Sequence, residues 1–274
     1  MAAMDIVSLD TLVQRIAPGS LLAIPPDYSG VSMAATRALV ARGAKDLRVL
    51  CVPTSGIQVD ILIGAGAVAE LEAAAVSLGE LGLAPRFTAA IKAGTLVMRD
   101  TTCPAVHAAL QASEKGVPFL PLRGLIGSDI LAQRGDWKLA ENPFAAGDPI
   151  VFLPAIRPDT ALFHVAKADR DGNVWIGRRR ELATVAHAAT RSLVTAETIV
   201  EGSLLDDETI AAGVVPGLYV EAIAEAPRGA WPLGLQDLYT ADEAEMKRYA
   251  EAARSDSGFR AWLDGFVGGA CAAA

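Results

Sequence analysis

The sequence predicts an α/β fold built on an open, mostly parallel sheet with flanking helices. In the middle of the 274-residue chain, short apolar runs alternate with helical stretches, which is the pattern of repeated strand–helix–strand units. Hydrophobic residues make up 52% of the chain and charged residues only 20%, enough apolar surface for a sizeable core. The sequence shows no linker and no internal repeat, so residues 1–274 are predicted to form a single domain.

The elements of the first half are predicted from apolar runs and from the glycines and prolines at their ends. The run "LLAIP" (21–25) indicates a strand, and the amphipathic stretch 32–43 indicates a helix that ends on Gly43. Pro104 favours a helix start, because the first helical position does not need an N–H group. Further strands are predicted at 46–53, 70–78, 95–102 and 117–124, and helices at 84–94 and 104–116.

Residues 125–149 interrupt this pattern, and a loop of that length in a compact domain usually serves a function or covers a neighbouring surface. A sharp turn is predicted where Asp169 is followed by Arg-Asp-Gly-Asn, since glycine and asparagine tolerate positive φ. The remaining predicted elements are strands at 149–156, 161–169, 192–200 and 219–227, and one final helix from about 242 to 266.

Charge and composition narrow the possible partners. The net charge of −8 argues against a general nucleic-acid binder, which would carry a basic face. The start of the sequence has no signal-peptide pattern, and the apolar runs are too short to span a bilayer. Cys51, Cys103 and Cys271 are too few and too widely spaced for a disulfide framework. A cytoplasmic protein without a nucleic-acid or membrane partner is predicted.

Two common kinds of site are not favoured. Gly64, Gly66 and Ala69 have the spacing of a dinucleotide-binding turn, but no acidic residue for the ribose lies about 20 positions further on. A glycine turn from a short helix into the next strand is therefore favoured. His107 and the two other histidines lie far apart, with no second ligand at metal-binding spacing, so no metal site is predicted.

Small polar residues follow three strands of the predicted sheet. Ser55 and Gly56 come after the strand at 46–53, Glu80 follows the strand at 70–78, and the turn Gly127-Ser128-Asp129 follows 117–124. Because the carboxyl ends of parallel strands meet at one edge, where open α/β folds bind ligands, these residues are predicted to bind substrate in one cleft. An ordinary turn with a helix cap is the alternative for 127–129.

Three consecutive arginines, Arg178, Arg179 and Arg180, follow the Asp169–Asn173 turn. They can be a solvated turn between a strand and a helix. They can also pair with a carboxylate, a phosphate or an acidic partner subunit.

The stretch "PDTALFHVAKADRDGNVWIG" resembles the family I coenzyme A transferases. Five more segments are similar, in order, to the α (A) subunit of glutaconate-type transferases, over about residues 10 to 265. They are "LIGAGAVAEL", "AAIKAGTLVMRDTT", "KGVPFLPLRGLIGSD", "ENPFAAGDPIVFLPAIRPDTALFHV" and "VVPGLYVEAIAEAPRGAWP".

This resemblance implies a CoA-transferase-like fold and a partner β subunit, in a heterodimer or heterotetramer. It implies a coenzyme A thioester and a carboxylic acid as substrates, with no permanently bound cofactor. The nucleophile would be a glutamate of the β subunit. Here the matching position reads "VPTSGI", with no carboxylate, so this chain would wall the cleft. The chain departs from the family pattern at Pro25, Pro26 and Asp27, which replace a glycine-rich loop. Proline lacks an N–H group, so these two prolines remove two backbone donors that the glycines would offer.

Two alternatives remain open. A second subgroup of this fold opens steroid-derived rings as CoA thioesters by hydrolysis, with the acid on the α-like subunit. In that case Glu80 is the best-placed acid of this chain and Asp100 the next. The other alternative is a non-catalytic scaffold that binds a CoA thioester or only a partner.

Overall fold

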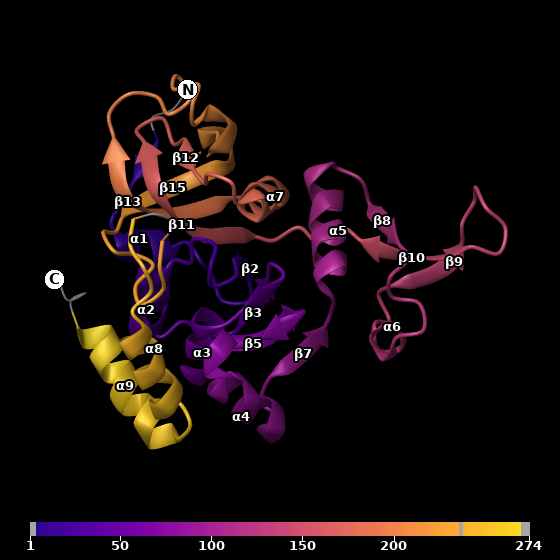
Figure 1. Cartoon of the computed structure of the whole chain (residues 1–274), viewed down its shortest axis with the longest axis horizontal. Coiled ribbons are helices and arrows are strands. Elements are labelled where there is room, and N and C mark those ends of the chain that lie inside the picture. Colours follow the sequence, from indigo (N-terminus) through magenta and orange to yellow (C-terminus); the bar gives the residue numbers. More distant parts are fainter. Residues whose placement is uncertain (1–3, 236–237, 270–274) are drawn as a thin grey trace.

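A computed structural model describes residues 4–235 and 238–269. Its main sheet is open, and every neighbouring pair along its principal path is parallel, so the predicted sheet is confirmed (Figure 1). In order across this path the strands are β1 (Asp5–Ile6), β15 (Val220–Glu225), β13 (Ser192–Val200), β11 (Thr160–Asp169), β2 (Leu21–Ile24), β3 (Leu47–Cys51), β5 (Val68–Ala73) and β7 (Val97–Asp100). The short strands β12 (Val174–Trp175) and β14 (Val214–Val215) extend β11 in antiparallel fashion.

Helices cover both faces of this sheet. On one face α1 (Leu9–Gln14), α2 (Met33–Ala41), α3 (Ile57–Gly64), α4 (Pro85–Ala93), α8 (Glu243–Ala252) and α9 (Asp256–Gly268) contribute to one apolar core. On the other face α5 (Cys103–Glu114) and α7 (Arg180–Ala188) contribute to a second. Neighbouring residues of β11 belong to different cores, Leu162 to the first and Phe163 to the second, because successive strand residues point to opposite faces. No helix in the described part of the chain is long and apolar enough to cross a membrane.

The glycine turn at Gly64 is present as predicted. Helix α3 ends at Gly64, Gly66 adopts a left-handed φ of 68°, and β5 begins at Val68. The single helix predicted at 242–266 was wrong, because Ser255 interrupts it. The Ser255 hydroxyl accepts the N–H of Gly258 at 3.1 Å and so begins a separate helix, α9.

A separate three-stranded sheet corrects the predicted position of segment 117–124. β8 (Phe119–Leu122), β10 (Pro149–Pro154) and β9 (Lys138–Glu141) pair in that order and antiparallel. With α6 (Asp129–Gln133), they project from the main sheet beside α5 (Figure 1). Pro121 gives a physical reason, since a proline inside a strand removes a ladder hydrogen bond and is tolerated at an edge, where β8 lies.

The Asp169–Asn173 turn is held by its own buried side chains. Asp169 Oδ1 accepts the N–H groups of Asp171 and Asn173, and its Oδ2 accepts the N–H of Leu204 at 2.8 Å. Asn173 in turn accepts the N–H of Gly217 at 3.0 Å. The turn therefore joins three segments of the fold.

Candidate functional site

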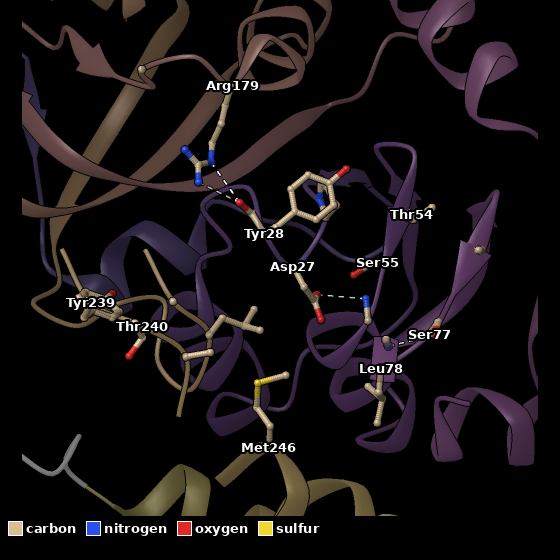
Figure 2. Close-up of a pocket in the computed structure, with 18 of the residues that line it drawn as sticks. Asp27, Tyr28, Thr54, Ser55, Ser77, Leu78, Arg179, Tyr239, Thr240 and Met246 are labelled. Atoms are coloured by element: carbon tan, nitrogen blue, oxygen red, sulfur yellow. Dashed lines mark hydrogen bonds between the residues drawn. The ribbon is translucent and has the colours of Figure 1, made fainter. Parts of the chain in front are cut away.

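A cavity of about 920 Å³ opens where several parallel strands of the main sheet end. Loops after β2, β3, β5 and β15 meet there, together with the end of β12 and one residue of α8 (Figure 2). The described residues that line it are Pro26, Asp27, Tyr28, Thr54, Ser55, Gly56, Ala75, Ser77, Leu78, Gly79, Trp175, Gly177, Arg178, Arg179, Leu233, Gly234, Tyr239, Thr240, Ala241 and Met246.

The cavity floor is the junction between β3 and α3. Two short parallel strands, β4 (Thr54–Ser55) and β6 (Ala75–Val76), hold the segments after β3 and β5 side by side. Helix α3 starts directly after Gly56, with its N-terminal end at the cavity. Helix N-termini present unpaired N–H groups and a partial positive charge, which favour an oxyanion or carboxylate.

The carboxylate of Asp27 accepts hydrogen bonds from two N–H groups at the start of this helix. Its Oδ1 accepts the N–H of Gly56 at 3.1 Å and its Oδ2 accepts the N–H of Ile57 at 2.9 Å. Gly56 is required for this approach, because a Cβ there would lie 2.3 Å from Asp27 Oδ2 and 2.5 Å from the carbonyl oxygen of Ser77. Burial raises the pKa of Asp27 to about 6, although both N–H groups act to lower it.

The hydroxyl of Ser55 is buried beside this carboxylate. Ser55 is only 4% exposed, and its Oγ has no nitrogen or oxygen partner within the described chain. The thiol of Cys51 lies within its reach, but sulfur is a weak hydrogen-bonding group. Burial raises the pKa of Cys51 far above its usual range, so this thiol stays neutral.

Arginines form the opposite wall. Arg179 donates from Nε and Nη2 to the carbonyl oxygen of Tyr28, at 3.2 and 3.0 Å, and so ties α7 to the loop after β2 (Figure 2). Arg178 lines the cavity, and it forms no ion pair with any residue that the structure describes. Arg180 begins α7 and is exposed.

A buried polar network supports the wall that contains Tyr239. The Tyr239 hydroxyl donates to Glu197 Oε1 at 2.5 Å and accepts the N–H of Ala230 at 3.2 Å. Glu197 also lies 2.8 Å from His164 Nε2 and accepts the N–H of Arg228 at 2.6 Å. Burial alone would raise the pKa of Glu197, but these hydrogen bonds outweigh it and the pKa is lowered.

The structure brings only part of the predicted site together. Ser55 and Gly56 line the cavity. Glu80 directly follows the lining residue Gly79 in the 3₁₀ turn Gly79–Leu81, but it is exposed and is not part of the lining. The Gly127-Ser128-Asp129 turn lies in the three-stranded extension and does not line the cavity. Its expected position at the edge of the parallel sheet was wrong, because β8 pairs antiparallel with β10.

Two features of the cavity were missed from the sequence. In the sequence Asp27 stands out only for the prolines before it, although it follows a strand just as Ser55 does. No local sequence pattern identifies Tyr239 and its neighbours as cavity residues. They line the cavity only because the chain folds back to it after β15.

A family model described as coenzyme A transferase matches residues 6–226. The chain belongs to the coenzyme A transferase family. A glutaconate coenzyme A-transferase from Acidaminococcus fermentans has a similar crystal structure, with a TM-score of 0.88 and 25% identity over 96% of this chain and 88% of that chain. The predicted family and fold are thereby confirmed.

Two relatives of similar length are named as subunits of enzymes. The chain is 28% identical over 273 residues to the A subunit of 3-oxoadipate CoA-transferase from Pseudomonas knackmussii, covering 97% of this chain and 94% of that protein. It is 29% identical, over 96% of its length and 92% of the relative's, to the IpdA subunit of a cholesterol ring-cleaving hydrolase from Rhodococcus jostii. An uncharacterized protein of Archaeoglobus fulgidus is 31% identical over 242 residues, and the chain spans 53% of its length. The names of the subunits support a partner subunit for this chain.

Proposed function

We propose that this chain is the α-type subunit of a heteromeric CoA-transferase, which moves coenzyme A between an acyl-CoA and a carboxylic acid. The observation that carries the proposal is the match to transferase A subunits over nearly the whole chain. The cavity at the strand ends supports it, since polar and cationic residues such as Ser55, Thr240 and Arg178 are in its lining.

The nucleophile is a glutamate of the partner β subunit. Its carboxylate attacks the thioester carbonyl and releases CoA thiolate, which leaves an acyl–glutamyl anhydride. The thiolate then attacks the glutamyl carbonyl, so that the free acid leaves and an enzyme–CoA thioester remains. The acceptor carboxylate repeats these steps in reverse. Covalent catalysis of this kind divides one difficult transfer into easier steps.

The contribution of this chain is to surround the reacting groups. The Ser55 hydroxyl is buried at the cavity floor without a nitrogen or oxygen partner in the described chain, and it would donate to an oxyanion that reaches this floor. Arg178 is available for an anionic part of a substrate.

The test is co-expression with a candidate β subunit. The complex should transfer CoA from an acyl-CoA to acetate, and the chain alone should not. Borohydride should trap a CoA thioester that maps to a glutamate of the partner. Robust transfer by the isolated chain, or an adduct on this chain, would refute the proposal.

The second candidate is a CoA-thioester hydrolase, favoured by the IpdA relative and by the acid in the cavity. That acid is Asp27, whereas Glu80 is exposed outside the lining. Water-dependent loss of acyl-CoA without any trapped adduct, abolished by Asp27→Asn and not by Glu80→Gln, would establish this activity instead. Binding of acyl-CoA with no turnover of either kind would leave a binding subunit.

A further inference from the structure

The N-terminal end of α3 is a built anion site that this chain fills with its own carboxylate. Gly56 has no side chain to cap the helix, and Asp27 reaches across from the loop after β2 to take the N–H groups of Gly56 and Ile57. Pro25 and Pro26, just before it, offer no N–H of their own. The polar group that this loop presents to the cavity floor is therefore an acid.

The buried hydroxyl of Ser55 indicates independently that a ligand approaches this floor. Ser55 is one of the lining residues, and its buried Oγ has no nitrogen or oxygen partner within the described chain. A buried hydroxyl without a strong hydrogen-bonding partner is unfavourable. A carbonyl or hydroxyl oxygen of a bound acyl group would satisfy it.

We propose that Asp27 determines the acyl specificity of the site, so that the cavity takes an acyl group that is uncharged at the α3 end and rejects one that carries a carboxylate there. This inference rests on the proposed function and assigns the substrate class of the same cavity. A substrate carboxylate at this floor would find both N–H donors occupied. It would also face a like charge in a part-buried site, where the repulsion is only weakly screened.

The charge of Asp27 gives the discrimination a pH dependence. The pKa of Asp27 is raised to about 6 by burial, so the group is charged at pH 7.5 and mostly neutral at pH 5.5. The groups that interact with it are the Gly56 and Ile57 N–H donors, the more distant carboxylate of Asp60, the buried thiol of Cys51 and the buried phenol of Tyr249 on α8. The rejection of a carboxylate should weaken as the pH falls through about 6.

The experiment compares two acyl-CoA substrates of equal chain length in the purified complex, with acetate as acceptor. Butyryl-CoA is uncharged at its end and succinyl-CoA carries a carboxylate. In the wild-type complex at pH 7.5, kcat/KM should favour butyryl-CoA by about 30-fold or more, as expected for like charges a few ångströms apart. Asp27→Asn should reduce this ratio at least about tenfold, mainly by a gain for succinyl-CoA.

The matched control is Asp10→Asn, which makes the same change of charge on the exposed face of α1. It should leave the ratio unchanged. The wild-type ratio should fall between pH 7.5 and 5.5, and the Asp27→Asn ratio should stay flat. If the amide variant does not assemble, Asp27→Ser removes the charge with a smaller polar side chain and gives the same comparison.

Equal use of the two substrates by the wild-type complex, or an unchanged ratio in both Asp27 variants, would overturn the inference while leaving CoA transfer intact. If the complex transfers CoA from neither substrate, the proposed function fails. The same pair is then compared by titration calorimetry, where weaker binding of succinyl-CoA that Asp27→Asn removes still supports the inference, and equal dissociation constants refute it.

Discussion

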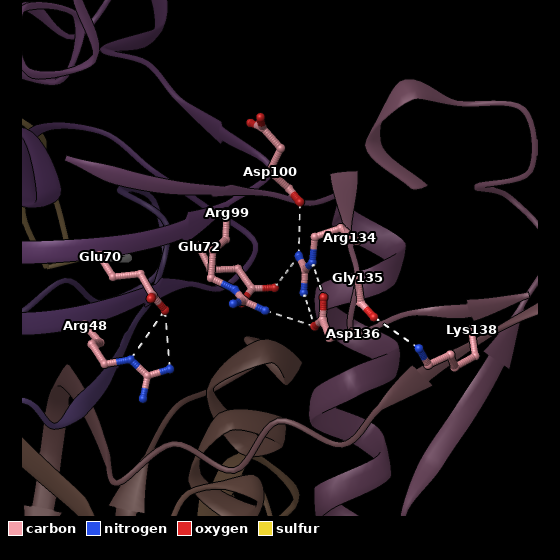
Figure 3. Close-up of polar contacts among 9 residues, drawn as sticks. All are labelled: Arg48, Glu70, Glu72, Arg99, Asp100, Arg134, Gly135, Asp136 and Lys138. Carbon is pink, nitrogen blue, oxygen red and sulfur yellow. Dashed lines mark hydrogen bonds and ion pairs between the residues drawn. The ribbon is translucent and has the colours of Figure 1, made fainter. Parts of the chain in front are cut away.

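Arg134 and Glu72 form a buried ion pair, with Arg134 Nη1 2.8 Å from Glu72 Oε1. Arg134 follows α6 in the three-stranded extension, whereas Glu72 lies on β5 of the main sheet, so the pair joins the two sheets (Figure 3). Arg134 also donates to the carbonyl oxygen of Asp100 at 3.0 Å and stacks over Trp137, 4.2 Å from the ring centroid. The extension is therefore fixed to β5 and β7.

Removal of Arg134 should destabilise the protein strongly. Arg134→Leu leaves the carboxylate of Glu72, which is 9% exposed, with only Arg99 at 3.5 Å among the described residues. Breaking a buried pair typically costs about 3–5 kcal/mol, and urea unfolding should show a loss of about 3 kcal/mol. Arg123→Leu breaks the exposed pair with Asp148 and should cost less than about 1 kcal/mol. Similar losses for the two variants would contradict the structural role of Arg134.

The Tyr239–Glu197 hydrogen bond should make the stability of the cavity wall depend on pH. The folded-state pKa of Glu197 is lowered from 4.5, so its stabilising contribution is present above that value and is lost as the pH falls through the folded pKa. Tyr239→Phe should cost about 2 kcal/mol at pH 7, and the difference from wild type should shrink between pH 5 and 3.

Urea unfolding at several pH values checks this. Tyr219→Phe is the control, because no hydrogen bond of its hydroxyl is found within the described chain. It should change the stability little at any pH. A cost of Tyr239→Phe that stays constant down to pH 3 would show that Glu197 is not the titrating group.

The main fold could be predicted because its signals are local. Each βαβ unit combines a short apolar run, an amphipathic stretch and a glycine or proline at the boundary, as at Gly64–Gly66, where the turn was predicted correctly. The position of β8 could not be predicted in this way. Its apolar run is compatible with a strand of the main sheet or of the three-stranded sheet. Only the pairing with β10, about 30 residues later, places β8 in the three-stranded sheet.

Site residues could be predicted only where they directly follow a strand whose end lies at the cavity. Ser55 and Gly56 lie in the cavity because β3 delivers them there directly. Glu80 follows β5 by several residues, and the 3₁₀ turn directs it to solvent. Asp27 gains its role from a contact with Gly56, 29 residues away, which no local pattern in the sequence contains.

The close approach of Asp27 to Gly56 should make Gly56 intolerant of a side chain. In Gly56→Ala the new Cβ would lie 2.3 Å from Asp27 Oδ2 and 2.5 Å from the Ser77 carbonyl oxygen, so the floor must shift. We expect a loss of about 1–3 kcal/mol in unfolding free energy and at least about a tenfold lower kcat/KM for the complex. Gly124→Ala, where nothing lies within 4 Å, should leave both quantities near wild type. Equal behaviour of the two variants would show that the floor is not closely packed.

Arg178 should hold an anionic part of a substrate, since it lines the cavity and forms no ion pair within the described chain. Arg178→Gln keeps most of the side-chain length but removes the charge. A charge-assisted hydrogen bond at a partly exposed site is worth about 1.5 kcal/mol, so KM for the acyl-CoA or for the acid should rise about tenfold, with kcat within about twofold of wild type.

Salt should raise the wild-type KM between 50 and 500 mM, because it screens an exposed charge, and should change the KM of the variant little. Arg180→Gln, an exposed neighbour outside the cavity lining, is the matched control and should leave KM unchanged at every salt concentration. Equal effects of the two substitutions would indicate that the arginines act through the general charge of this surface, and the assignment of Arg178 to the cavity would then be wrong.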